Sequence, residues 1–212
     1  FMAGKDSGQN VFMLTSFNPG SGKSFLAMNI AMSFAIKKKR ILVIDGDLRH
    51  GSTSSYVDSP KTGLSDYLGN RVSDWKEIIV KDEKYDNLHI IPIGTVPPNP
   101  TELLEDGKLA TLIEVLRSEY DYIFIDCPPI DIVADAQIIE KLADRTVFVV
   151  RSGLLDRSML PELENIYQEK RFKNLSVILN GTESAGGRYG YRYGYRNGYS
   201  SYYGNKGKMG GG

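Results

Sequence analysis

Short apolar runs rich in β-branched residues alternate along this chain with longer stretches whose apolar residues recur at helical spacing. The runs predict six strands, at residues 11–15, 40–44, 88–93, 122–125, 146–150 and 175–179. The longer stretches predict helices at 24–35, 64–68, 73–80, 108–119, 134–142 and 159–170. Several runs are apolar at nearly every position, so both faces of those strands must be covered. The pattern predicts a doubly wound α/β fold, a mostly parallel sheet flanked by helices, rather than a β-sandwich.

A glycine-rich segment follows the first predicted strand. It reads Phe17-Asn18-Pro19-Gly20-Ser21-Gly22-Lys23-Ser24 and matches the Walker A pattern, except that Phe17 replaces the first glycine. Such a turn exposes backbone N–H groups, and the positive end of the following helix points to the same place. We expect Lys23 to reach the β and γ phosphates of a nucleotide and Ser24 to ligate Mg²⁺. The alternative is a strand-turn-helix corner that merely contains Gly-Lys-Ser.

Acidic residues follow two of the other strands. Asp45 and Asp47 come after the second predicted strand, and Asp126 comes after the fourth. The carboxyl ends of strands form the edge where open α/β sheets bind ligands, and an aspartate there suits the Walker B role of holding Mg²⁺. The predicted nucleotide-binding residues are Pro19, Gly20, Ser21, Gly22, Lys23, Ser24, Phe25, Arg49 and Asn180; the predicted metal ligands are Ser24, Asp47 and Asp126.

Three residues in or beside these motifs each allow two interpretations. Arg49 could neutralise phosphate charge or pair with an acidic neighbour. Asn180, after the last strand, could hydrogen-bond adenine or be an ordinary turn residue. Cys127 could be a nucleophile, but the only histidines, His50 and His89, lie in no recognisable motif, which favours a small residue packed beside the magnesium site.

Charge and cysteine content exclude several classes of protein. Lysine plus arginine and aspartate plus glutamate each total 26, and this balance argues against a dedicated nucleic-acid binder. A single cysteine allows no intramolecular disulfide and fits the cytoplasm. No apolar run approaches the roughly 18 to 20 residues that span a bilayer. We expect this piece to be soluble and, because residues 1–4 resemble the end of an element, to be part of a longer chain.

The composition changes abruptly at Gly186. The last 27 residues hold seven of the 13 tyrosines and ten of the 22 glycines. From Ala185 onward the chain carries five basic residues and no acidic one, so the tail is +5 and residues 1–184 carry 21 − 26 = −5. We therefore predict a P-loop domain at 1–185 and a disordered tail at 186–212.

Together these motifs resemble the cytoplasmic catalytic domain of the bacterial tyrosine kinases that regulate capsule and exopolysaccharide export. The stretch Asp45-Gly46-Asp47 is similar to their Walker A′ motif, and residues 94–104 are typical of their loop-to-helix segment. Two departures stand out. The family's Glu-x-x-Arg-x-x-Arg segment before the first strand is missing, so weak self-assembly is expected, and Asn18 stands where partition and division ATPases carry a signature lysine.

The resemblance implies an ATP- and Mg²⁺-dependent protein-tyrosine kinase, with Lys23, Asp45 and Asp47 as catalytic residues and Asp45 facing the incoming phenol. The tail tyrosines would be the phosphoacceptors: Tyr189, Tyr191, Tyr193, Tyr195, Tyr199, Tyr202 and Tyr203. Transfer between subunits of a homo-oligomeric ring is implied, with tail-to-active-site contacts. A membrane-embedded polysaccharide co-polymerase, on the same or a separate chain, and a tyrosine phosphatase are the implied partners, at the cytoplasmic face of the inner membrane.

Two other functions fit parts of the pattern. A nucleotide-switched ATPase of the MinD/ParA type would use the same loop without phosphorylating tyrosine. An interaction module is the non-enzymatic alternative, because interleaved arginine and tyrosine in the tail could stack on single-stranded nucleic acid or on other tails. The balanced charge and the complete phosphate site favour the kinase, without a nucleic-acid partner.

Overall fold

The computed structural model describes residues 5–130 and 134–182. The chain divides into two units, Phe1–Thr182 and Glu183–Gly212. The predicted domain boundary at residue 186 and the seven candidate phosphoacceptor tyrosines lie outside the described residues. Among the helices that are described, none has the length and apolar character needed to cross a membrane.

A seven-stranded sheet forms the centre of the described part, in the order β3-β4-β2-β5-β1-β6-β7. The strands are β1 (Val11–Thr15), β2 (Ile41–Asp45), β3 (Val80–Lys81), β4 (Leu88–Ile91), β5 (Tyr122–Asp126), β6 (Arg145–Arg151) and β7 (Ser176–Asn180). All neighbouring pairs are parallel except β3 and β4. The predicted mostly parallel sheet is confirmed.

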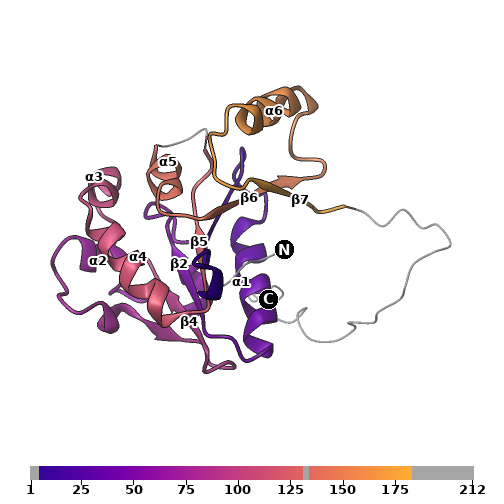
Figure 1. Cartoon of the computed structure of the whole chain (residues 1–212). Helices are drawn as coiled ribbons and strands as arrows, with labels where there is room; N and C mark the ends of the chain where they lie inside the picture. The colour runs from indigo at the N-terminus through magenta and orange to yellow at the C-terminus, as the bar shows by residue number, and fades with distance from the viewer. Residues whose placement is uncertain (1–4, 131–133, 183–212) are drawn as a thin grey trace, which may run out of the picture. The chain divides into compact units, whose positions relative to one another are not determined.

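Helices cover both faces of this sheet (Figure 1). They are α1 (Lys23–Ile36), α2 (Leu64–Leu68), α3 (Pro100–Glu105), α4 (Lys108–Glu119), α5 (Asp135–Glu140) and α6 (Leu160–Gln168), with short 3-10 turns η1 (Lys5–Ser7), η2 (Ser54–Val57), η3 (Trp75–Ile78) and η4 (Arg157–Met159). Alternate side chains of β1 enter two separate cores. Val11 and Met13 belong to the core that also holds residues of α2, α4, α5 and α6, whereas Phe12 and Leu14 belong to the core that holds residues of α1. The doubly wound architecture is confirmed.

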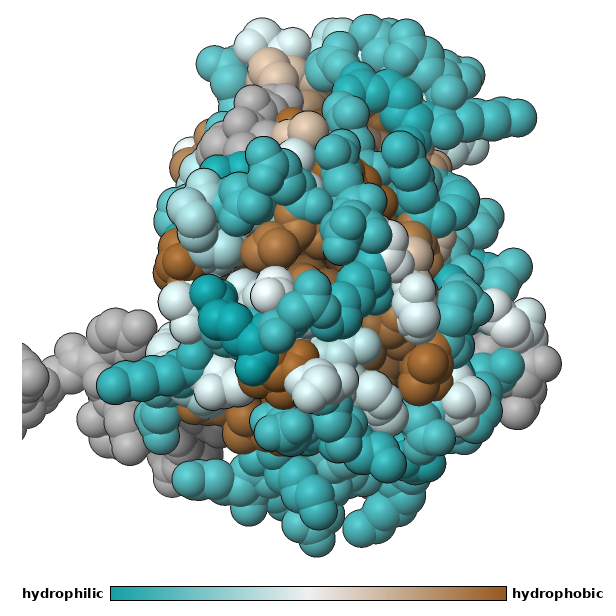
Figure 2. All heavy atoms as spheres, turned by 90° about the vertical axis from the view of Figure 1, so that its left-hand side faces the viewer, coloured by the Kyte–Doolittle hydropathy of each residue, from teal (hydrophilic) through white to brown (hydrophobic). Residues whose placement is uncertain are grey.

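The spacing of apolar residues in the helices explains which faces are buried and which are exposed. In α4, Leu109, Leu112, Ile113 and Leu116 are spaced to form one buried stripe. Figure 2 shows the side of the molecule that carries α2, α3 and α4, where hydrophilic residues cover most of the surface and hydrophobic residues appear in separate patches. This polar exterior is what an amphipathic helical layer over a sheet produces.

The predicted helix at 73–80 is wrong. Only a 3-10 turn, η3, forms there, and the Asp74 carboxylate caps it by accepting a hydrogen bond from the Lys76 N–H. The next residues leave the turn, and β3 pairs antiparallel with β4. The run Ile78-Ile79-Val80 explains the outcome, because β-branched side chains favour extended backbone when a strand edge is near.

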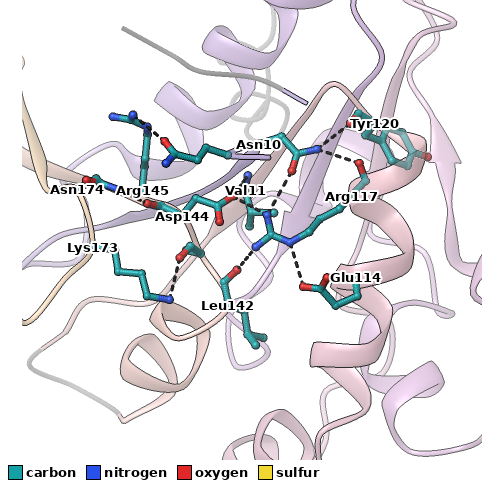
Figure 3. Close-up of polar contacts among 12 residues, drawn as sticks. Asn10, Val11, Glu114, Arg117, Tyr120, Leu142, Asp144, Arg145, Lys173 and Asn174 are labelled. Atoms are coloured by element: carbon teal, nitrogen blue, oxygen red, sulfur yellow. Dashed lines mark hydrogen bonds and ion pairs between the residues drawn. The ribbon is translucent and has the colours of Figure 1, made fainter. Parts of the chain in front are cut away.

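A polar network closes the end of the sheet opposite the strands' carboxyl termini (Figure 3). Asp144 Oδ2 accepts hydrogen bonds from the Arg117 guanidinium at 2.6 Å and from the Val11 N–H at 2.9 Å. Asn10 donates to the carbonyl groups of Arg117 and Tyr120. The network therefore joins the start of β1, the last turn of α4 and the start of β6.

Candidate active site

The phosphate loop connects β1 to α1. Gly20 and Gly22 have φ angles of 74° and 92°, a region that L side chains rarely adopt. Ser16 and Ser21 both donate their hydroxyl groups to the Asn18 carbonyl at 2.8 Å, which holds the turn. No side chain caps α1, so its first N–H groups are free to bind an anion.

Phe17 explains the departure from the Walker A pattern. Its side chain is 3% exposed and meets Phe148 of β6 edge-on, with ring centroids 4.8 Å apart. The first position of the loop is therefore an anchor in the core. Most later residues of the loop are more accessible: Pro19, Gly20 and Phe25 are exposed, and Gly22, Lys23 and Ser24 are partly exposed, whereas Ser21 is buried.

Asp45 and Asp126 lie side by side at the same edge. They are the last residues of β2 and β5 and are register partners in the parallel sheet. Asp45 is completely buried, and its Oδ2 accepts hydrogen bonds from the N–H and the hydroxyl of Ser54, both at 2.7 Å. Burial, and then the charge of Asp126, raises the pKa of Asp45 to about 7, although the Ser54 hydrogen bonds oppose the shift.

Asp126 is almost as buried, at 1% exposure, and its Oδ2 accepts a 2.7 Å hydrogen bond from Thr53. Burial raises the pKa of Asp126, while hydrogen bonds from Ser24 and Thr53 and the charge of Lys23 oppose the rise. The structure thus brings Lys23 and Ser24 within interaction range of Asp126.

The residues present fit a magnesium ion. Asp45 Oδ1 and Asp126 Oδ1 are buried and have no hydrogen-bond partner. Burial destabilises Asp126 as an anion, and a divalent cation bound to it would offset that cost. In the described ranges, no group of three or more His, Cys, Asp or Glu side chains is arranged to hold a metal alone. That is the usual situation for Mg²⁺, which takes most of its ligands from water and nucleotide phosphates.

Asp47 is the least buried of the three aspartates, at 8% exposure. Its Oδ1 accepts hydrogen bonds from the N–H groups of Arg49 and His50, at 3.2 and 3.3 Å. Its carboxylate therefore shapes the loop after β2 and also lies near Asp45 and Asp126, whose pKa values its charge raises.

Arg49 forms an ion pair with an acidic residue, which is one of the two roles that the sequence allows. Its Nε lies 3.2 Å from Asp135 Oδ2, and its Nη2 donates to Thr101 Oγ1 at 3.1 Å. Thr101 in turn donates to the fully buried Asp135 at 2.6 Å. Contact of Arg49 with a phosphate stays a prediction.

Asn180 lies against the phosphate loop. Its Nδ2 donates to the Ser21 carbonyl at 3.0 Å, and its Oδ1 accepts from the Gly181 N–H at 2.9 Å. Contact with adenine stays a prediction. Cys127 is buried, and burial followed by the charge of Asp126 raises the pKa of its thiol well above the usual range, which favours the interpretation of a small packed residue.

Sequence reasoning missed Thr53, Ser54 and Arg151. The first two orient the buried carboxylates, and Arg151 Nη1 donates to the Gly20 carbonyl at 2.8 Å. The polar run after Asp47 is the only sequence signal for Thr53 and Ser54, and polar runs are ordinary in loops. Nothing in the sequence around Arg151 indicates its contact with the phosphate loop.

Comparison with known proteins identifies related chains. The AAA domain family matches residues 10–154. Tyrosine-protein kinase CpsD of Streptococcus pneumoniae is 35% identical over 200 residues, which cover 93% of this chain and 84% of CpsD. Putative tyrosine-protein kinase EpsB of Ralstonia solanacearum is 36% identical over 192 residues, which cover 88% of this chain but only 25% of EpsB.

Solved structures give the same picture. The kinase domain of the Escherichia coli tyrosine kinase ETK superposes with a TM-score of 0.77 at 32% identity, covering 88% of this chain and 72% of that domain. The septum site-determining protein MinD of Pyrococcus horikoshii, complexed with Mg-ADP, has a TM-score of 0.66 at 22% identity and covers 81% of this chain and 70% of MinD. The likeness to MinD shows the fold alone.

Proposed function

This chain belongs to the bacterial tyrosine-kinase family, and we propose that it transfers the γ-phosphoryl group of ATP to tyrosines of its own C-terminal segment. The observation that carries the proposal is the register pairing of Asp45 with Asp126 next to the amino end of α1. Carboxylates, a lysine and uncapped N–H groups at one edge of the sheet support the proposal, because phosphoryl transfer needs such groups around the phosphate.

Binding of ATP is assigned to the phosphate loop. The N–H groups from Gly20 to Ser24 and the Lys23 ammonium would hold the β and γ phosphates, with Pro19 and Phe25 at the exposed rim of the loop. Ser24, Asp47 and Asp126 would hold Mg²⁺ directly or through water. When bound, Mg²⁺ neutralises charge on the transferred phosphoryl group. Arg49 and Asn180 complete the proposed nucleotide site.

Asp45 is assigned to the tyrosine hydroxyl. A phenol has a pKa near 10, so transfer of its proton to a carboxylate with a pKa near 4 is uphill by roughly 8 kcal/mol. In the metal-free protein the pKa of Asp45 is raised to about 7, which lowers that cost, whereas a bound Mg²⁺ would lower the pKa again. Because Asp45 is buried, the hydroxyl reaches its free Oδ1 only after the covering side chains move apart. Asp45 then orients the hydroxyl and takes its proton late in the transfer.

The acceptors are the seven tail tyrosines, and transfer runs between chains of a ring. A flexible segment of 20 residues has a contour length near 70 Å, so reach alone allows both self and neighbour transfer. Family membership favours the neighbour. The ring itself, formed through contacts of each tail with a neighbouring active site, is part of the proposal.

The proposed setting is the cytoplasmic face of the inner membrane. There the kinase would work with a membrane-embedded polysaccharide co-polymerase and would be reset by a tyrosine phosphatase, and its phosphorylation state would regulate export of capsule or exopolysaccharide. The matching segment is most of CpsD but a quarter of EpsB. These proportions support a co-polymerase that lies on a separate chain in some members and on the same chain in others.

A mixing experiment tests transfer between chains. Full-length wild-type chain is incubated with ATP, Mg²⁺ and a size-tagged full-length Lys23→Met variant, and phosphotyrosine is located by mass spectrometry. We expect phosphate on the tail of the Lys23→Met chain only when wild type is present. The matched control is a Lys23→Met chain that also carries Phe at all seven tail tyrosine positions, and this chain should stay unmodified. Absence of phosphotyrosine on every chain, with ATP hydrolysed, would favour a MinD-type ATPase instead.

A further inference from the structure

Two side chains at the carboxyl ends of β6 and β7 contact the phosphate loop from outside. Arg151 and Asn180 are register partners in neighbouring parallel strands. Arg151 donates to the Gly20 carbonyl at 2.8 Å, and Asn180 donates to the Ser21 carbonyl at 3.0 Å. Consecutive carbonyl groups of the loop are therefore both held by the same pair of strand ends.

Holding a carbonyl group also sets the direction of the next N–H. A peptide unit is planar, and in the trans form the C=O of one residue and the N–H of the following residue point in opposite directions. No peptide bond in the described residues is cis. The Gly20 carbonyl thus fixes the Ser21 N–H, and the Ser21 carbonyl fixes the Gly22 N–H. These are two of the donors that the loop offers to phosphate.

The fit between Asn180 and the loop is tight. A Cβ atom added to Gly22 would lie 2.3 Å from Asn180 Nδ2, so glycine at this position leaves room for the contact and also suits the φ of 92°. Asn180 is itself fixed, because its Oδ1 accepts from the Gly181 N–H and its carbonyl accepts from the Ser152 N–H. Arg151 packs over Gly181, where an added Cβ would lie 3.3 Å from its Cγ.

We propose that Arg151 and Asn180 are positioning residues of the phosphate loop, which turn the Ser21 and Gly22 N–H groups toward the nucleotide phosphates before the nucleotide binds. They also join the end of β7, from which the chain runs on into the tyrosine-rich tail, to the loop that binds phosphate. Arg151 is exposed and Asn180 is half-buried, so neither contributes much to the core. The inference rests on the nucleotide binding proposed above.

The test measures binding of two probes, Mg·ADP and Mg·pyrophosphate, to the full chain by titration calorimetry. Pyrophosphate has the phosphates but no base. We expect Asn180→Ala and Arg151→Ala each to lower the affinity for both probes about fivefold to tenfold, which is the effect of losing one hydrogen bond. Asn180→Asp, which keeps the size but loses the donor, should weaken both at least as much, and Arg151→Lys should recover part of the affinity.

Controls are available at the first residue of β6 and just before β7 (Figure 3). Asn174 donates to the Asp144 carbonyl at 2.8 Å, and Arg145 donates to Gln9 at 2.9 Å. Asn174→Ala and Arg145→Lys should leave both affinities within twofold of wild type.

Two outcomes would overturn the proposal. Weaker ADP binding with unchanged pyrophosphate binding would assign Asn180 to adenine, and unchanged binding of both probes with a lower unfolding temperature would assign a purely structural role. Neither outcome bears on tyrosine transfer, and failure of tyrosine transfer would leave this comparison of affinities intact.

Discussion

Asp45 and Asp47 are two residues apart but differ in environment. Asp45 is fully buried with one free oxygen, whereas Asp47 is 8% exposed and accepts hydrogen bonds from the backbone of its own loop. We predict that Asp45→Asn reduces phosphotransfer at least 100-fold with Mg·ADP affinity nearly unchanged, because the loss of a proton acceptor costs about 10² to 10⁴ in rate. Asp47→Asn and Asp126→Asn should weaken binding and transfer together. Equal losses of Mg·ADP affinity in all three variants, measured by calorimetry, would remove any separate role for Asp45.

The same residue makes stability depend on pH. The folded-state pKa of Asp45 is raised to about 7, so folding favours its protonated form. That contribution is complete below the unfolded pKa near 4 and is lost as the pH rises through 7. We predict that in metal-free buffer Asp45→Asn raises the free energy of unfolding at pH 8 by a few kcal/mol relative to wild type, with the gain shrinking toward pH 4. Urea unfolding across this range checks the prediction, and a difference that does not vary with pH would contradict it.

At the scale of elements, the network around Arg117 and Asp144 joins β1, α4 and β6 (Figure 3). Both side chains are about one-fifth exposed, at 21% and 18%. Asp144→Ala would leave the Arg117 guanidinium and the Val11 N–H without their shared acceptor. We predict a loss of roughly 2 to 4 kcal/mol in the free energy of unfolding, measured in urea.

Glu114 supplies the control for that measurement. It pairs with the same arginine at 3.1 Å, but its side chain is 73% exposed. Glu114→Ala should cost less than about 1 kcal/mol, because solvent screens an exposed ion pair. Similar losses for Glu114→Ala and Asp144→Ala would mean that the buried network contributes little.

At the scale of the whole molecule, charge is divided between a body at −5 and a tail at +5. Opposite charges should speed the encounter of a tail with a neighbour's body. We predict that the initial rate of transfer to the Lys23→Met chain falls severalfold between about 0.1 and about 1 M salt, where the screening length falls from about 10 to about 3 Å. A tail with Arg188, Arg192 and Arg196 changed to Gln should show little of this dependence. An equal salt effect on both tails would show that charge on these arginines does not drive the encounter.

The amino-acid sequence by itself determined the elements whose cause is local. Strands that are apolar on both faces require cover on both sides, and the glycines of the phosphate loop adopt φ angles that their own backbone permits, so the α/β class and the loop were predictable. The predicted helix at 73–80 does not form because β3 pairs with the neighbouring strand β4 instead. The periodicity of a local segment carries no information about such a distant partner.

Tertiary structure alone decided how the site is assembled. The register that pairs Asp45 with Asp126, the choice of Asp135 as the partner of Arg49, and the contact of Asn180 with Ser21 all join residues far apart in the chain. The order of strands in the sheet sets these pairings, and that order depends on how the helices bury their apolar faces. Local sequence therefore specifies which groups are available for chemistry, and packing specifies which of them meet.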